Sequence, residues 1–151
     1  MHYMLPMLQV TSYQGRVLCS LCVHHAQAKG VGVINASALG MGLLTPGGPP
    51  SWHPAPRGLQ DACASAVTMC TSRGTDASAV AIAQAVRDSR VATTLVGMCT
   101  PEEVRRNVTI VTGAFADGSA ERDAGIVDAL KPLWQGAGPV AWESGLLQNN
   151  Q

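Results

Sequence analysis

Two short apolar segments set the strongest constraint on what this chain can fold into. Residues 32–36 (Gly-Val-Ile-Asn-Ala) and 92–96 (Ala-Thr-Thr-Leu-Val) are rich in β-branched side chains, with glycine or a charged residue near their ends. Short apolar runs of this kind are typical of strands covered on both faces, as in a parallel sheet. We therefore expect two buried parallel strands.

Helical periodicity follows the first segment. Residues 57–73 carry apolar side chains at spacings of three and four, and they lie between Pro56 and Gly74, residues typical of helix ends. The apolar positions of this stretch are Leu59, Ala62, Cys63, Ala66, Val67 and Cys70. A second helix is expected from Ser78 to Asp88. Alternation of strands and helices predicts an α/β fold with a parallel sheet.

Two more helices are expected after the second segment. Thr100, Pro101 and Glu103 form the pattern of a capping box with proline in the first turn. The inward stripe of the helix that follows is expected to be Val104, Val108 and Val111. A last helix is expected over residues 119–130, ending before Pro132.

Two strands are too few for an independent sheet. Each would expose an edge of unpaired backbone groups, and the only further candidate, residues 7–13, has a poor strand pattern. Residues 1–25 as a whole are expected to form a divergent N-terminal segment. We therefore interpret the chain as part of a larger α/β fold.

Composition excludes several classes of function. Ten Lys and Arg residues balance ten Asp and Glu residues, so the chain lacks the basic surface that nucleic acids and acidic membranes require. No apolar run reaches the roughly 18 residues that a membrane-spanning helix needs. The N-terminus lacks the pattern of a secretory or mitochondrial leader, and we expect a cytosolic protein.

The cysteines fit a reducing compartment. Their number, five, is odd, and they lie in apolar surroundings rather than in a disulfide framework. The segment 19–25 (Cys-Ser-Leu-Cys-Val-His-His) raises a metal-binding or redox alternative. It has neither haem-attachment spacing nor an evident strand before it, and we favour one face of an apolar helix that ends at Lys29. Cys63 and Cys70 are expected in the core, and no metal site is expected.

Five segments resemble, in order, the C-terminal part of the aldo-keto reductases, especially their L-galactose dehydrogenase-like aldose dehydrogenase branch. Residues 29–44 (KGVGVINASALGMGLL) resemble the seventh strand and its loop, and residues 48–55 (GPPSWHPA) resemble a loop distinctive of the branch. Residues 95–99 (LVGMC) are similar to the eighth strand and its exit. Residues 101–107 are similar to the helix that holds the adenosine end of the cofactor, and residues 142–145 (WESG) to the branch's tail.

This resemblance implies a (β/α)8 TIM barrel, of which the chain would supply strands 7 and 8 with their helices. Residues 26–145 would form the C-terminal part of the reductase domain and residues 146–151 a tail. A full barrel takes typically about 250 residues, so this one would be incomplete. The partners implied are a nicotinamide cofactor and a small sugar.

The loop after the first strand is the expected pyrophosphate site. Its small residues let an anion approach backbone N–H groups. The resemblance gives this role to Ser37, Leu39 and Gly42. Ala38 stands where the family usually has proline, which loosens the turn, and a plain connecting loop is the alternative.

The adenosine end of the cofactor is expected at the second strand's exit. The residues implied there are Gly97, Met98, Cys99, Glu103 and Asn107. Relatives that prefer NADP carry Lys and Arg where this chain has Gly97 and Glu103. A carboxylate repels a 2′-phosphate and accepts a hydrogen bond from a 2′-hydroxyl, so NAD is expected over NADP. Glu103 serving only the capping box is the alternative, and Arg106 replaces a family glutamate that contacts adenine.

The family's catalytic Asp, Tyr, Lys and His cannot be carried over to this chain. The family spaces Asp and Tyr five residues apart, but Tyr13 has Leu8 at that distance and Tyr3 has nothing. Trp52 and Trp142 are expected either near the cofactor and sugar or as packing residues. One hypothesis is the cofactor-binding part of an NAD(P)-dependent dehydrogenase acting at C1 of L-galactose, L-fucose or D-arabinose, inactive alone. The other is a non-catalytic product that associates with a full-length barrel or binds a nucleotide weakly.

Overall fold

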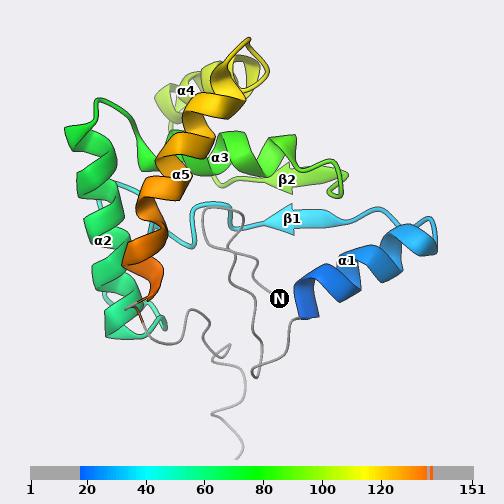
Figure 1. Cartoon of the computed structure of the whole chain (residues 1–151), viewed down its shortest axis with the longest axis horizontal. Coiled ribbons are helices and arrows are strands. Elements are labelled where there is room, and N and C mark those ends of the chain that lie inside the picture. Colours follow the sequence, from blue (N-terminus) through cyan, green and yellow to red (C-terminus); the bar gives the residue numbers. More distant parts are fainter. Residues whose placement is uncertain (1–17, 136, 138–151) are drawn as a thin grey trace, which may run out of the picture.

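The described part of the chain consists of five helices and a small parallel sheet. The computed structural model describes residues 18–135 and 137, with side chains from Val23 onward (Figure 1). The elements are, in chain order, α1 (Leu18–Ala28), β1 (Ile34–Ala36), α2 (Arg57–Ser72), α3 (Ala77–Arg87), β2 (Thr93–Leu95), α4 (Pro101–Gly113) and α5 (Ser119–Gln135). Among these elements, no helix is long and apolar enough to cross a membrane.

The two predicted strands form one parallel pair. The register joins Ile34 to Thr93, Asn35 to Thr94 and Ala36 to Leu95. The crossover between them contains a long loop, α2 and α3, as a parallel connection requires. The predicted α/β class and the parallel pairing are therefore confirmed.

The expectation that both faces of these strands are buried is wrong. On one face, Asn35 is buried and donates from Nδ2 to Thr94 Oγ1 at 3.4 Å, and the Thr94 hydroxyl lies 3.5 Å from the Ala85 carbonyl of α3. On the other face, Ile34 is 60% exposed and Leu95 is 56% exposed. Apolar composition predicted two covered faces, but the described helices cover only one.

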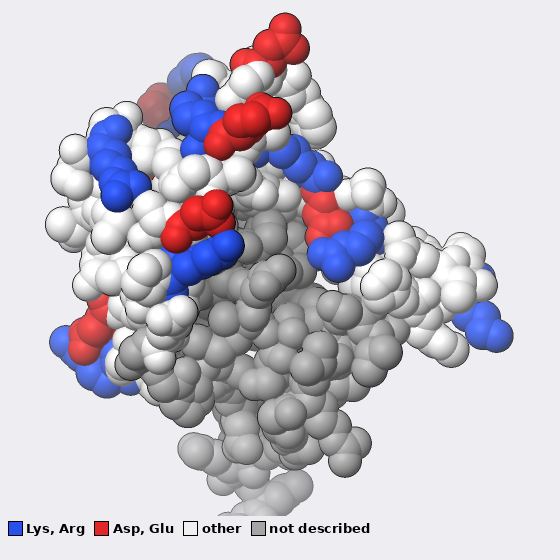
Figure 2. Space-filling view, in the orientation of Figure 1, with Lys and Arg blue, Asp and Glu red and all other residues white. Residues whose placement is uncertain are grey.

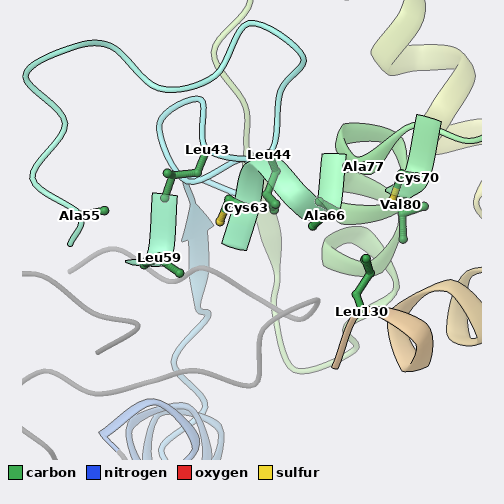
Figure 3. Packing of buried hydrophobic residues seen from close by; sticks show 11 residues of the cluster. Leu43, Leu44, Ala55, Leu59, Cys63, Ala66, Cys70, Ala77, Val80 and Leu130 are labelled. Atoms are coloured by element: carbon green, nitrogen blue, oxygen red, sulfur yellow. The ribbon is translucent and has the colours of Figure 1, made fainter. Parts of the chain in front are cut away.

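The core lies where α2, α3 and α5 meet the loop that follows β1. Figure 3 shows Leu43 and Leu44 of that loop among side chains of α2, with Leu130 of α5 nearby. The predicted stripe of α2 is buried at Leu59, Ala62, Cys63, Ala66 and Cys70. Burial raises the pKa of the Cys63 thiol to about 12. The predicted core role of the α2 cysteines is confirmed.

A buried arginine joins α3 to the start of α5. Arg87 pairs with Asp123 at 2.7 Å, and their side chains are 14% and 6% exposed. The same guanidinium donates to Ser119 Oγ at 2.9 Å and to the Ala114 carbonyl at 2.7 Å. Three acceptors compensate the desolvated cation, so this network fixes α5 against α3.

The expected stripe of α4 does not pack inward. Val104 and Val108 are 45% and 58% exposed, Val111 is half-buried, and no residue of α4 is fully buried. The helix contacts α3 through another face, because Arg106 forms an ion pair with Asp76 at the start of α3. Periodicity predicted the apolar stripe of α4, but it did not show which face of α4 packs against α3.

Helix α5 continues past the proline that was expected to end it. It contains Pro132 and ends at Gln135. Proline removes the hydrogen bond to the carbonyl four residues earlier, here Asp128, and both residues are exposed. The missing bond therefore falls among exposed residues of the helix, while Leu130 packs in the core. Residues 7–13 and Trp142 lie outside the described residues, as do the side chains of Cys19 and Cys22.

Candidate functional site

The parallel register brings two predicted segments to one edge of the sheet. Ala36 and Leu95 are paired and end their strands, so residues 37–44 and residues 96–99 leave the sheet side by side (Figure 1). Ligands of α/β proteins bind at this carboxyl edge. The segments that carry the expected pyrophosphate and adenosine contacts are thus adjacent.

The first segment has an unusual backbone. Ser37 and Met41 are non-glycine residues with positive φ, 63° and 51°, and Gly40 and Gly42 have φ of 57° and 99°. Left-handed conformation costs an ordinary residue about 1–2 kcal/mol. Strain of this kind persists only where the surroundings hold it, and it gathers at functional sites.

Gly42 cannot be replaced without moving the backbone. A Cβ atom there would lie 2.9 Å from the Gly48 carbonyl oxygen, and φ is also in the left-handed range. The loop therefore requires glycine at this position, as the pyrophosphate-site prediction assumed.

Several N–H groups of this loop are available to a ligand. Gly40 donates to the Ser37 carbonyl at 2.8 Å, and Leu44 donates to the Leu39 carbonyl at 3.2 Å. Within the described residues, no hydrogen bond uses the N–H groups of Leu39, Met41 or Gly42, and all three residues are partly exposed. Such a set of free donors suits an anion.

The loop is anchored from several sides. Leu43 and Leu44 are buried in the core, and Ser78 of α3 donates from Oγ to the Leu44 carbonyl at 2.8 Å. His53 is buried and lies 3.0 Å from the Gly40 carbonyl through Nε2. Local sequence patterns did not predict this role for the histidine, because its contact lies 13 residues away in the chain. Trp52 beside it is 71% exposed, so it does not pin the loop.

The second segment begins α4 with the predicted capping box. The Glu103 carboxylate accepts hydrogen bonds from the N–H groups of Cys99 at 2.6 Å and Thr100 at 3.2 Å, and Thr100 Oγ1 accepts from Glu103 N at 3.2 Å. The predicted capping box is confirmed. The carboxylate nevertheless remains exposed beside Gly97, Met98 and Cys99.

The two α4 residues that the family resemblance places near adenine have different surroundings. Arg106 is ion-paired with Asp76, which caps α3 by accepting from Ser78 N at 2.7 Å. Asn107 is half-buried and takes part in no hydrogen bond among the described side chains. Asn107 therefore remains available, whereas Arg106 is committed to helix packing.

A shallow cavity of about 210 Å³ lies elsewhere, between α3, α4 and α5. Ala83 and Ile110 line it, together with the Arg122–Asp123 pair. Asp123 is already bonded to Arg87, so the cavity is a packing seam rather than a site prepared for a ligand. Within the described part of the chain, no three His, Cys, Asp or Glu side chains are placed to hold a metal ion.

The surface charge of the described residues is mixed. Figure 2 shows basic and acidic side chains interspersed on the visible face, with no broad area of one sign. Several of them are paired locally, as in Arg57–Asp61 and Lys131–Asp128. The described charges on this face are therefore interspersed rather than gathered into a patch of one sign.

Comparison with known proteins completes this description. A family model described as the aldo/keto reductase family matches residues 16–122. L-galactose dehydrogenase from Arabidopsis thaliana is 38% identical over 126 residues, which cover 83% of this chain and 38% of that relative. The chain thus spans about two fifths of the length of this curated relative. Since the family model covers more than half of its residues, the chain belongs to the aldo/keto reductase family.

Proposed function

We propose that this chain is the cofactor-binding C-terminal part of an NAD(P)-dependent aldose dehydrogenase. In this proposal β1 and β2 correspond to the seventh and eighth strands of a (β/α)8 barrel. The observation that carries it is the strained loop after β1, whose free N–H groups at Leu39, Met41 and Gly42 fit a pyrophosphate. The likeness to L-galactose dehydrogenase supports the choice of an aldose as substrate class.

The residues divide between the two ends of the cofactor. Ser37, Leu39 and Gly42 would hold the pyrophosphate, the serine with its hydroxyl and the others with backbone N–H groups. The adenosine end would lie against the start of α4, with contacts from Gly97, Met98, Cys99, Glu103 and Asn107. The nicotinamide, when bound, accepts hydride from C1 of the sugar.

NAD is proposed over NADP. The exposed Glu103 carboxylate lies at the exit of β2, bonded to Cys99 N, where NADP-preferring relatives place positive charge. Its charge would repel a 2′-phosphate, and its second oxygen can accept a hydrogen bond from a 2′-hydroxyl. The capping box and the cofactor preference therefore do not compete for this side chain.

This chain alone is proposed to have no turnover. Proton transfer at the sugar hydroxyl needs an acid–base group, and the sequence lacks the family's Asp and Tyr spacing. Purified chain mixed with NAD⁺ and L-galactose, L-fucose or D-arabinose should produce no NADH. Sustained NADH formation would contradict this part of the proposal.

Free thiols and balanced charge support the cytosol as the location of this protein.

Calorimetric titration tests cofactor binding directly. The 151-residue chain should bind NAD⁺, and Ser37→Ala should raise the Kd by about two- to tenfold, the value of one hydrogen bond. Ser65→Ala is the matched control, because Ser65 lies exposed on α2 and bonds only within that helix. No binding at millimolar NAD⁺, or equal effects of the two variants, would contradict the proposed site.

A second candidate function is favoured by the exposed apolar surface. Ile34 and Leu95 on the open sheet face, Val104 and Val108 of α4, and Phe115 after that helix are 45–66% exposed. Such a surface suits a non-catalytic chain that associates with a longer aldo/keto reductase. Sedimentation of the chain with and without L-galactose dehydrogenase tests this, and a lone monomer in both samples would exclude it.

A further inference from the structure

His53 holds two segments together through both ring nitrogens. The Ala55 N–H donates to Nδ1 at 3.1 Å, so Nδ1 is an acceptor. The ring proton must then be on Nε2, which lies 3.0 Å from the Gly40 carbonyl and donates to it. The ring is 13 residues distant from Gly40 in sequence and is buried, so this contact is shielded from water.

This contact fixes a single peptide plane in the loop. The carbonyl of Gly40 and the N–H of Met41 belong to one planar trans peptide, in which they point in opposite directions. Because His53 holds the carbonyl, the Met41 N–H is turned away from His53. Within the described residues no protein group accepts a hydrogen bond from this N–H.

The Gly40–Met41 peptide plane, which His53 holds, is also the part of the loop whose rotation would relieve backbone strain. Gly40 and Met41 on its two sides both have positive φ, and Met41 is not a glycine. The other anchors act at the end of the loop, where Leu44 is buried and bonded to Ser78. Without the histidine, the Gly40 carbonyl would keep, among the described residues, only the 3.3 Å hydrogen bond from Leu43 N.

We propose that His53 is a positioning residue for dinucleotide binding: through the Gly40 carbonyl it aims the Met41 N–H at the pyrophosphate. This inference rests on the proposed cofactor site. It adds a residue from the loop before α2 to a site otherwise built from the two strand exits. His53 itself touches no ligand in this role.

Two substitutions of His53 distinguish the hydrogen bonds made by its two ring nitrogens. In His53→Gln the amide Nε2 can still donate to Gly40, whereas in His53→Asn the shorter side chain can accept only from Ala55. We expect His53→Asn to raise the Kd for NAD⁺ by about tenfold, because the loop is no longer preorganised. His53→Gln should stay within about twofold of the native chain.

Hydrogen exchange supplies a readout that needs no ligand. The amides of Leu43, Leu44 and Thr45 are bonded within the loop and should exchange about tenfold faster in His53→Asn, with α2 unchanged. If the loop amides of His53→Asn exchange at the native rate and its affinity for NAD⁺ is unchanged, the inference is wrong. Acceleration spread evenly over α2 would also overturn it, because that result indicates a general structural role.

The unsubstituted chain provides a further test. ¹⁵N NMR should show the His53 ring protonated at Nε2, and a proton on Nδ1 alone would overturn the inference even if neither variant folds. Absence of NAD⁺ binding by the native chain would refute the proposed function instead. In that case, exchange and tautomer still decide whether His53 holds the loop, so the two failures are distinguishable.

Discussion

Arg106 of α4 is ion-paired with Asp76, the residue that caps the N-terminus of α3. One carboxylate therefore serves the start of one helix and the side of another. The resemblance to the family placed Arg106 where a glutamate contacts adenine. In this chain the same position joins two helices, which explains how its charge is compensated without a cofactor contact.

Replacing Arg106 should affect stability rather than cofactor affinity. Arg106→Ala should lower the free energy of unfolding by about 0.5–1 kcal/mol, since the pair is partly exposed. The Kd for NAD⁺ should stay within about twofold. Urea unfolding and calorimetry measure the two effects. Lys131→Ala removes a more exposed pair and is the control, and a large loss of NAD⁺ affinity in Arg106→Ala alone would show a cofactor contact.

The buried network around Arg87 should be the most sensitive ion pair of the described residues. Asp123→Asn leaves the guanidinium buried without its counter-charge and should cost about 3 kcal/mol of unfolding free energy. Asp128→Asn breaks an exposed pair and should cost less than about 0.5 kcal/mol. Urea midpoints of the two variants provide the comparison. Equal midpoints would mean that the buried pair contributes no more than a surface pair.

Asp88 should make stability depend on pH. Its hydrogen bonds from the Arg90 side chain, at 2.8 and 2.7 Å, hold the pKa of the carboxyl below its usual value of 3.8. A lowered folded-state pKa gives stability that is complete above the unfolded-state value and is lost as the pH falls through the folded-state value. Asp88→Asn should therefore cost about 1 kcal/mol at pH 7 and nothing once the native carboxyl is protonated.

Urea unfolding between pH 7 and pH 3 checks this dependence. Asp61→Asn is a suitable control, because Asp61 forms an exposed pair with Arg57 and should show a much smaller difference. A difference between Asp88→Asn and the native chain that stays constant over the range would contradict the assignment.

The described thiols should differ sharply in reactivity. Burial raises the pKa of Cys63 to about 12 and also raises that of Cys70, whereas Cys99 is exposed. Alkylation proceeds through the thiolate. Iodoacetamide at pH 8 should therefore modify Cys99 and leave the two α2 cysteines unmodified until urea unfolds the chain. Peptide mass mapping reads out each site, and labelling of Cys63 in the native chain would contradict the core packing.

Cofactor preference should respond to one charge at the start of α4. Glu103→Gln retains an oxygen for the capping box and removes the charge, so NADP⁺ affinity should rise about two- to fivefold relative to NAD⁺. Glu102→Gln changes a neighbouring charge that is paired with Arg105, and it should leave the ratio closer to that of the native chain. If the ratio of NADP⁺ to NAD⁺ affinity is the same in both variants, Glu103 does not determine the cofactor preference.

Local patterns predicted local structure well. Both strands, the stripe of α2 and the Thr100–Glu103 capping box follow from residues within a few positions of one another. Glycine at position 42 was expected for the approach of an anion, whereas the structure requires it for the close contact with Gly48. In each case the deciding interaction lies within one element or one tight turn.

Such local patterns did not predict the contacts between residues far apart in the sequence. Periodicity identified the valines of α4 but not which face of the helix would meet α3, and proline chemistry could not show that Pro132 falls on an exposed face. The contact between His53 and Gly40 joins two loops, and the pair of Arg106 with Asp76 joins two helices. These depend on tertiary placement, which one sequence does not encode at fixed spacings.

The sheet that is covered on one face only has a consequence for the stability of the protein in a cell. Ile34 and Leu95 lie on a sheet face that α3 does not cover, and extended apolar segments of this kind are what folding chaperones and proteases recognise. Within the described part of the chain nothing shields them. If a partner covers this face, as the second candidate function proposes, the amount of this protein that accumulates should rise with the supply of that partner.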